Sequence, residues 1–467
     1  MKFNKITSAL LSLNFLACTI IGTSIPYAIY NASSPLTASA SVGYTEGKYG
    51  VLTYKNYGSY IEVSNCDESA TEVVIPSSID GLPVLSVGEE AFSFCTSLTN
   101  VVISDGITSI GRHAFYYCDC LTNITLPDSI SSIDVCAFCD CKSLTTINLP
   151  HGITTINDSA FENCQSLKNI IIPETVTSIG TLVFKGCTSL TGIEFPEGFT
   201  SIGHFSFLGC KKLTAVKFPD TLTYIGDACF ASCHSLKNIS LPDSLTSMGS
   251  SVFLNCFDLE SVRLSNNLSS IDADSFYGCD SLTNITIPAS VTSIGKDAFR
   301  NNFVLEGIII LNPDCEIYDS FATITNIYSD AYPDSTDRTD YCYNGIIYGY
   351  SDSTAQKYAE KYKYRFISID DIPLDDKDND GDIDAIADRL PGDVDSDGSV
   401  NAVDASLILS EYALTATGKV SSLSDIQNIT ADINADNAVD SSDASTVLSY
   451  YAYTATGGTD SIEDFLS

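Results

Sequence analysis

The chain has 467 residues, more than one ordinary hydrophobic core accommodates, so its length predicts several modules. Its 59 acidic and 23 basic residues give a formal net charge of −36. Nucleic acid and anionic membranes repel a polyanion of this kind, so we expect no nucleic-acid partner.

The first 40 residues have the pattern of an export signal. Two lysines precede an apolar run over residues 6–21, and Ala38-Ser39-Ala40 offers a small-x-small cleavage site. We predict that residues 1–40 are a signal peptide and that the mature protein is secreted, extracellular or cell-surface-associated, with no membrane span after signal removal. Two alternatives stay open. One is a membrane anchor, for which the apolar run is short. The other is a lipoprotein signal with Cys18 as the modified residue, although the apolar run continues past that cysteine.

A repeat with a period of 23 residues occupies residues 73–311, and residues 44–72 have the place of an N-terminal cap. Leu recurs six residues after each Phe, from Leu98 to Leu305, and Cys occupies the position between them from Cys95 to Cys279, with Asn302 in the last repeat. The Phe positions are Phe92, Phe115, Phe138, Phe161, Phe184, Phe207, Phe230, Phe253, Phe276 and Phe299.

Each repeat combines a strand-like and a helix-like pattern. In one of them, residues 124–126 alternate apolar and polar, Pro127 ends the strand, and residues 137–144 have helical spacing. A single repeat buries too few apolar side chains to offset the ordering of its backbone, so the repeats must stack. The pattern resembles BspA-like leucine-rich repeats of bacterial surface and secreted proteins. That resemblance implies an α/β leucine-rich-repeat solenoid with a parallel sheet plus short helices.

One position per repeat holds only Gly, Asn or Asp, the residues that best tolerate a positive φ. We therefore predict a left-handed residue there in every coil. The residues are Gly88, Gly111, Asp134, Asn157, Gly180, Gly203, Gly226, Gly249, Asp272 and Gly295.

Residues 312–369 follow the repeat and resemble a C-terminal cap, although the pairing of residues 312–343 stays open. We expect a strand over 346–350, a helix over 354–361 and a second strand over 364–368. Ser353 and Gln356 have the spacing of a capping box. Residues 370–390 are predicted to be an acidic linker; the alternative is a weak third calcium loop starting at Asp376, with Ala387 at position 12.

Two acidic loops, 39 residues apart, end the chain. Both place oxygen-bearing side chains at loop positions 1, 3, 5, 9 and 12, the arrangement that surrounds Ca²⁺ with oxygen ligands. Gly398 and Asn437 stand at position 6, where the loop turns sharply. The predicted ligands of two calcium ions are Asp393, Asp395, Asp397, Asn401 and Asp404 in the first loop and Asp432, Asn434, Asp436, Asp440 and Asp443 in the second.

A helix is expected after each loop, over residues 405–418 and 444–457. Each carries apolar residues at i, i+3, i+4 and i+7, which predicts one apolar face per helix. Gly418 and Gly457 stand where C-caps are expected. The two apolar sets are Ala405, Ile408, Leu409 and Tyr412, and Ala444, Val447, Leu448 and Tyr451.

The duplicated loop and helix over residues 391–467 resemble a type I dockerin. The resemblance implies a small all-α, EF-hand-like module that binds a cohesin domain of a scaffoldin, and it implies the calcium ligands given above. The basic pair usual on the helix is replaced by Leu-Ser in both halves. The implied partner-binding residues are Ala402, Val403 and Ser410 in one half and Ser441, Ser442 and Ser449 in the other.

The 17 cysteines invite a search for disulfides and metal sites. Stacked coils point the Cβ atoms of the cysteine ladder in parallel, which is poor geometry for disulfides, so we expect buried free thiols. Cys315 and Cys342 are the candidate disulfide. Zinc at the additional thiols remains an alternative; these are Cys120, Cys136 and Cys139, near Cys118 and Cys141.

No nucleophile elbow, zinc-protease helix or phosphate loop is present. We therefore predict a non-catalytic protein whose solenoid binds an unknown protein or glycan. The alternative is a carbohydrate-active or plant-cell-wall-binding component of polysaccharide degradation, since paired carboxylates require only spatial proximity. The residues expected to face outward from the sheet are Val102, Thr125, Asn148, Ile171, Glu194, Lys217, Ser240, Arg263, Thr286 and Ile309.

Overall fold

The structure is a computed structural model that describes residues 43–326, 343–370, 402–416 and 439–455, together with Ala431 and Ile433. The expected signal peptide, Cys342, residues 371–390 of the expected acidic linker and the two expected glycine C-caps near the C-terminus lie outside the described residues. Within the described residues, no helix is long and apolar enough to cross a membrane.

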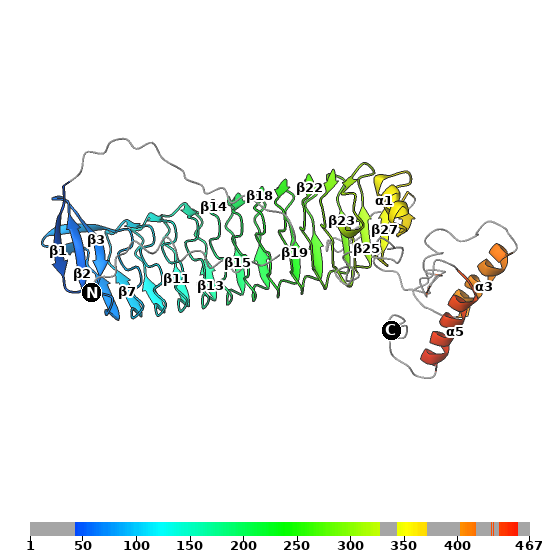
Figure 1. Cartoon of the computed structure of the whole chain (residues 1–467), viewed down its shortest axis with the longest axis horizontal. Coiled ribbons are helices and arrows are strands. Elements are labelled where there is room, and N and C mark those ends of the chain that lie inside the picture. The colour runs from blue at the N-terminus through cyan, green and yellow to red at the C-terminus, as the bar shows by residue number, and fades with distance from the viewer. Residues whose placement is uncertain are drawn as a thin grey trace. The chain divides into compact units, whose positions relative to one another are not determined.

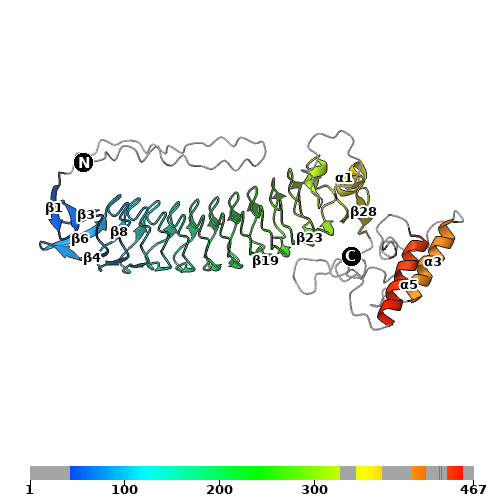
Figure 2. The ribbon, with the colours of Figure 1, turned by 60° about the horizontal axis from the view of Figure 1, so that its bottom comes forward.

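Residues 72–326 and 343–368 wind into a solenoid (Figures 1 and 2). The coils over residues 72–317 each contribute one strand to each of two ladders, whereas the strands Ile346–Gly349 and Arg365–Ser368 extend the first ladder only. Partners in parallel pairs of the repeat differ by 23 residues, as Ile147 and Ile170 do, so one repeat makes one coil. The expected parallel-sheet leucine-rich-repeat fold is confirmed.

The first ladder contains β4 (Glu72–Ile75), β7 (Asn100–Ile103), β9 (Asn123–Thr125), β11 (Thr146–Asn148), β13 (Asn169–Ile171), β15 (Gly192–Glu194), β17 (Ala215–Lys217), β19 (Asn238–Ser240), β21 (Ser261–Arg263), β23 (Asn284–Ile287), β25 (Gly307–Ile310), β27 (Ile346–Gly349) and β28 (Arg365–Ser368). The second contains β6 (Leu82–Val87), β8 (Ser109–Ile110), β10 (Ser132–Ile133), β12 (Thr155–Ile156), β14 (Ser178–Ile179), β16 (Ser201–Ile202), β18 (Tyr224–Ile225), β20 (Ser247–Met248), β22 (Ser270–Ile271), β24 (Ser293–Ile294) and β26 (Glu316–Ile317).

The helical spacing in each repeat corresponds to successive hydrogen-bonded turns, so the expected short helix does not form within the described coils. Left-handed residues interrupt the segment: Cys136 has φ 53° and Asp140 has φ 58° in one coil. Coils are also joined here by backbone hydrogen bonds, such as that from Phe115 N–H to the Ala137 carbonyl at 2.8 Å. A helix would use these groups internally, whereas the turns make them available to the next coil.

The expected position of the left-handed residue is wrong. None of the ten Gly, Asn and Asp residues has positive φ; the left-handed residues lie two and six positions later. Gly is favoured for a different reason, because a Cβ on Gly203 would lie 2.3 Å from the Gly180 carbonyl oxygen of the preceding coil. Close approach between coils, and not backbone dihedral angle, therefore favours Gly at this position in seven of the ten coils, and Asp or Asn occupies it in the other three.

The core is a set of columns that run along the solenoid. The ten Phe rings are fully buried, and consecutive rings stack with centroids 4.8–5.8 Å apart. The Leu column is fully buried and the Cys column nearly so. From Cys118 to Cys279, each thiol of this column donates to the Phe carbonyl of the preceding coil, as Cys187 does to Phe161 at 3.3 Å. The expectation of buried free thiols is confirmed for this column.

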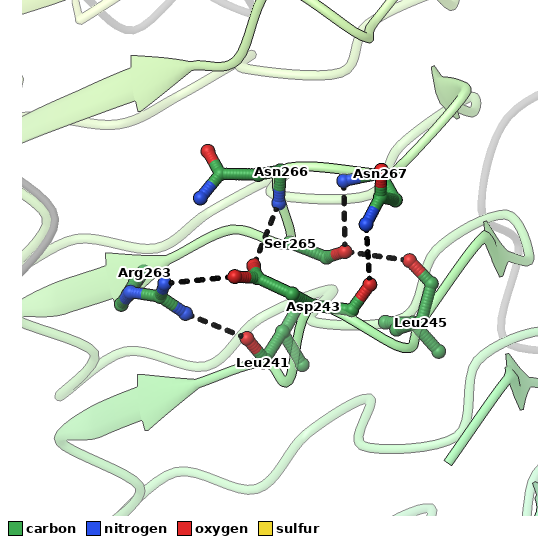
Figure 3. A network of polar contacts seen from close by, with 7 residues as sticks. All are labelled: Leu241, Asp243, Leu245, Arg263, Ser265, Asn266 and Asn267. Atoms are coloured by element: carbon green, nitrogen blue, oxygen red, sulfur yellow. Dashed lines mark hydrogen bonds and ion pairs between the residues drawn. The ribbon is translucent and has the colours of Figure 1, made fainter. Parts of the chain in front are cut away.

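One coil replaces the usual Pro after its strand with Ser265, whereas the coils on both sides carry Pro there. A polar network takes over the turn (Figure 3). The Ser265 hydroxyl donates to the Leu245 carbonyl at 2.6 Å. Asp243 accepts from the Asn266 N–H at 3.0 Å and from the Arg263 guanidinium at 3.4 Å. These hydrogen bonds hold in place a turn that lacks the fixed φ of proline.

Different elements cover the two ends of the stack. At the first end, β1 (Thr45–Tyr49), β2 (Leu52–Asn56) and β3 (Ile61–Cys66) are antiparallel, β3 joins β6 in parallel, and β5 (Ser78–Ile79) pairs with β6. At the other end, α1 (Thr354–Tyr362) follows β27, and a 3-10 turn spans Phe321–Thr323.

The helix expected over residues 354–361 and its N-cap are confirmed. Ser353 Oγ accepts from the Gln356 N–H at 3.1 Å. The Gln356 side chain accepts from the N–H of Asp352 at 2.7 Å, one residue earlier than a capping box requires. Lys363, with φ 60°, ends the helix.

Candidate calcium and docking site

The described part of the C-terminal module contains two equivalent helices, α3 (Ala402–Ala416) and α5 (Ser441–Ala455). They pack against each other and lie side by side in Figure 2. Their contact is a small apolar core around small side chains. Its buried members are Ala405, Ile408, Ala431, Ile433, Ala444 and Val447.

Only half of each expected apolar face is buried, which corrects the sequence prediction. Leu409 and Tyr412 on α3 are 42% and 41% exposed, and Leu448 and Tyr451 on α5 are 43% and 45% exposed. The helices pack through a narrow Ala-Ile and Ala-Val stripe, so the residues at i+4 and i+7 turn outward. With Val403, which is 54% exposed, these four residues are the exposed large apolar side chains of the two helices, and we call the five together the apolar docking face.

The residues at loop position 12 are fully buried carboxylates in both halves, Asp404 and Asp443. Asp443 accepts the Ile433 N–H on Oδ1 and the Asp440 N–H on Oδ2, both at 2.9 Å. Asp440 at position 9 in turn accepts the Ser442 N–H at 2.6 Å. The structure thus brings together Asp440 and Asp443 of the second loop. The other expected ligands lie outside the described residues: Asp393, Asp395, Asp397, Asn401, Asp432, Asn434 and Asp436.

These observations fit a hard cation in each loop. Burying a carboxylate is costly unless hydrogen bonds or a cation compensate, and both halves bury one at the same loop position. Carboxylate oxygens are the ligands that Ca²⁺ prefers, and position 12 is where such loops place their last ligand.

The expected partner-binding residues are all exposed: Ala402, Val403, Ser410, Ser441, Ser442 and Ser449. The hydroxyls of Ser410 and Ser449 donate to the carbonyls of Ser406 and Ser445 on their own helices, at 2.7 Å each. Sequence reasoning missed Leu409, Tyr412, Leu448 and Tyr451 as surface residues. The signal available was the replacement of the basic pair by Leu-Ser in both halves.

The outer face of the first strand ladder is mostly polar, with Ile171, 78% exposed, as an apolar exception. Some of its charges are paired between coils: the Lys217 ammonium lies 2.6 Å from the Glu194 carboxylate. Ile309, expected to face solvent, is 2% exposed because Tyr348 and Ile367 of the last two strands pack against it in a separate apolar cluster.

The additional cysteines separate into different environments. Cys120 is exposed, whereas Cys136 and Cys139 lie together with their Sγ atoms 3.0 Å apart. Cys315 is buried, and its expected disulfide partner lies outside the described residues.

Two family models match the chain. The BspA-type leucine-rich repeat region matches residues 63–191 and 181–306 in six copies, which together span more than half of the chain. The chain belongs to the BspA-type leucine-rich-repeat family. The dockerin type I domain matches residues 391–450, so this BspA-type protein carries a dockerin at its C-terminal end.

Solved structures similar to this BspA-type chain include bacterial leucine-rich-repeat proteins. A leucine-rich cell surface protein from Faecalibacterium prausnitzii has 26% identity and a TM-score of 0.42, with coverage of 61% of this chain and 97% of that one. A leucine-rich repeat protein from Bacteroides ovatus has 24% identity and a TM-score of 0.43, with coverage of 71% and 100%. A search of curated proteins found no match.

The two matched families define the module types of this BspA-type protein. A type I dockerin is a calcium-binding domain that has a cohesin as its general partner. Leucine-rich solenoids and dockerins are non-catalytic modules, and both families are typical of extracellular or cell-surface proteins.

Proposed function

We propose that this chain is a secreted, non-catalytic protein that docks onto a cohesin domain of a scaffoldin and presents its solenoid as a binding surface for a protein or glycan. The observation that carries the proposal is the apolar docking face. Residues 39 apart, Leu409 with Leu448 and Tyr412 with Tyr451, are exposed to nearly the same extent on two paired helices. Large apolar side chains exposed together on paired helices are typical of a protein-binding surface.

Two calcium ions, one per loop, are part of the proposal. The buried carboxylates of Asp404 and Asp443 at the start of α3 and α5 would hold the first helical turns against the loops. Without a cation the acidic side chains of each loop repel one another, so folding of the module is coupled to metal binding. The helix pair, and with it the docking face, therefore depends on calcium.

The solenoid would provide the ligand-binding surface. The first strand ladder offers an extended, mostly polar face of the kind on which solenoids bind their ligands. A cluster of aromatic rings favours a glycan over a protein as the ligand. The Phe94 side chain is 46% exposed, and its ring stacks on that of Tyr117 with centroids 5.5 Å apart and meets that of Tyr116 edge-on with centroids 5.4 Å apart. Exposed aromatic rings are suited to stacking on sugar rings. A carbohydrate-active or plant-cell-wall-binding role is the alternative that this cluster supports.

The docking proposal is tested by cohesin binding to the full chain in calcium and in chelator. We expect binding to require calcium and to fall by more than about 100-fold when Leu409→Asp and Leu448→Asp are combined, since central apolar residues dominate interfaces. Ser406→Ala, an exposed change on α3, is the matched control and is expected to bind like the parent chain. Binding that persists in chelator, or that the double variant leaves unchanged across a panel of cohesins, contradicts the proposal.

The solenoid proposal has its own assay. Polysaccharide binding is measured with the full chain and with Phe94→Ala, and hydrolysis products are sought in the same mixtures. Retention of polysaccharide by the parent chain and its loss in the variant support glycan binding by the aromatic cluster. Equal retention by both chains contradicts a role for that cluster, and released sugar contradicts a non-catalytic solenoid.

A further inference from the structure

We propose that Cys136, Cys139, His113 and Glu162 form a binding site for a single Zn²⁺ ion on the turn side of the solenoid. The proposal rests on how the coils align these four residues. His113 and Cys136 occupy the same register position in consecutive coils, 23 residues apart, and so do Cys139 and Glu162. Neighbouring coils are separated by about 4.8 Å. The four residues therefore lie on three consecutive coils, at neighbouring positions of the same turn.

The distances suit a metal ion. The Sγ atoms of Cys136 and Cys139 are 3.0 Å apart, and Cys139 Sγ lies 3.9 Å from Glu162 Oε2. One ligand atom from each of these three residues lies within 4.8 Å of the other two. Two thiolates on one tetrahedral Zn²⁺ are about 3.8 Å apart, so a small rotation of the side chains admits the ion.

The two sulfur atoms already face each other, because the Cys139 thiol donates a hydrogen bond to the Cys136 Sγ. His113 is half-buried and occupies the register position of Cys136 one coil earlier, so it is the proposed fourth ligand, reached by rotation of its side chain. Binding would release the thiol protons to solvent, as metal binding to cysteine does.

The surroundings complete the site. The Lys185 ammonium holds the other Glu162 oxygen, Oε1, at 3.0 Å, so it orients the carboxylate with Oε2 toward the thiols. Cys139 is 3% exposed, whereas Cys136 and His113 are half-buried, so an ion has access from one side. Two thiolates, one carboxylate and Lys185 together balance a divalent cation. A set of two sulfur ligands, one nitrogen and one oxygen favours Zn²⁺ over Ca²⁺.

The solenoid also supplies substitutions that its coils tolerate. Ser159 occupies the register position of Cys136 in the next coil with φ 55°, close to the 53° of Cys136. Ala231 occupies the position of Cys139 in a later coil, where it is buried. The double variant Cys136→Ser/Cys139→Ala is therefore expected to fold, which thermal unfolding without added metal checks.

The test uses Co²⁺ as a probe, added to the reduced, metal-free full chain with calcium present in excess. Thiolate-to-cobalt charge-transfer absorption is expected at one Co²⁺ per chain and is expected to disappear when Zn²⁺ displaces the probe. The oxygen ligands of the dockerin loops cannot produce this band. The double variant is expected to lose it, and Cys120→Ser, which changes an exposed thiol, is expected to keep it.

Two further variants distinguish a metal ligand, Glu162, from a residue that orients a ligand, Lys185. Glu162→Gln is expected to weaken Co²⁺ binding and change the spectrum, because a ligand is lost. Lys185→Met is expected to weaken binding by roughly 10–100-fold with an unchanged spectrum, as for a residue that orients a ligand. The proposal is overturned by an absent band, by a band that survives in the double variant, or by a Cys136–Cys139 disulfide in protein isolated with Zn²⁺.

Discussion

The stacked Phe column makes the stability of the solenoid depend on single rings in its interior. Phe161 is fully buried between Phe138 and Phe184, with ring centroids at 5.5 and 5.7 Å and interplanar angles of 3° and 6°. Phe161→Ala removes this ring and leaves a cavity that neighbouring coils, held by backbone hydrogen bonds, cannot fill. We expect the free energy of unfolding to fall by about 4 kcal/mol.

A second change separates burial from stacking. Phe161→Leu keeps most of the buried volume but loses two aromatic pairs worth roughly 0.5–1.5 kcal/mol each, so a loss of about 1–3 kcal/mol is expected. Phe257→Ala is the control, because Phe257 is 38% exposed and its loss should cost under about 1 kcal/mol.

The assay is urea unfolding of the full chain in calcium, followed by far-ultraviolet circular dichroism. The expected order of loss is Phe161→Ala, then Phe161→Leu, then Phe257→Ala. If Phe161→Ala lies within about 1 kcal/mol of the parent chain, the column is not a major source of stability. If Phe161→Leu matches Phe161→Ala, the cavity argument is wrong.

Three other measurements follow from the structure. Chelator is expected to reduce helical circular dichroism of the full chain while the solenoid transition stays unchanged, and calorimetric titration of the chelated chain should count two Ca²⁺ ions, one fewer for Asp443→Ala. In metal-free native protein, Cys136 and the exposed Cys120 should react quickly with a thiol reagent. Burial raises the pKa of thiols in the cysteine column, such as Cys187, so these should stay unreactive until the protein unfolds. Mass spectrometry of the labelled chain measures both. The hydrogen bond from the Asn266 N–H lowers the pKa of the Asp243 carboxyl. The stability that the ionised carboxylate contributes is therefore present above its unfolded pKa and is lost as pH falls through its folded pKa. Asp243→Asn should lower the free energy of unfolding by under about 1 kcal/mol in neutral solution and not at all in strong acid, as unfolding at both pH values would show.

The period of the sequence was enough to predict the coil, the first strand ladder and the buried columns, because a repeat of constant length imposes one register. The second ladder, with strands such as Ser132–Ile133, was not predicted. The left-handed positions were not predictable from residue type. Leu182 and Phe205 adopt φ 61° and 59°, although such residues rarely do. Their N–H groups donate to the carbonyls of His204 and Asp227 in the next coil, at 2.9 and 2.8 Å. Hydrogen bonding between coils imposes the turn, and a single repeat in the sequence does not contain that information.

The helix pair shows a different limit of sequence reasoning. The i, i+3, i+4, i+7 pattern correctly identified Ala405 and Ile408 as buried, but a pattern does not say how wide the contact is. Small side chains on both helices bring them close and leave the neighbouring Leu409 and Tyr412 exposed. The resemblance to dockerins was enough to predict the module. The exposure of Leu409 and Tyr412 depends on how closely the second helix packs, so it required the structure.

Regularity itself explains why the zinc proposal concerns one place in the solenoid. Every coil has a residue at the register position of Cys136 and another at that of Cys139. Across the coils these two positions hold residues of unrelated chemistry, such as Leu182 and Asp297 at the position of Cys136. The stack only guarantees that residues one period apart lie side by side. A site arises where consecutive coils hold compatible ligands, and at these two positions cysteine appears only at Cys136 and Cys139. If Co²⁺ binds there, similar sites in other solenoids of this period should be recognisable as ligand residues separated by one repeat, and a chain with Cys136 moved by one coil should lose the metal while keeping the fold.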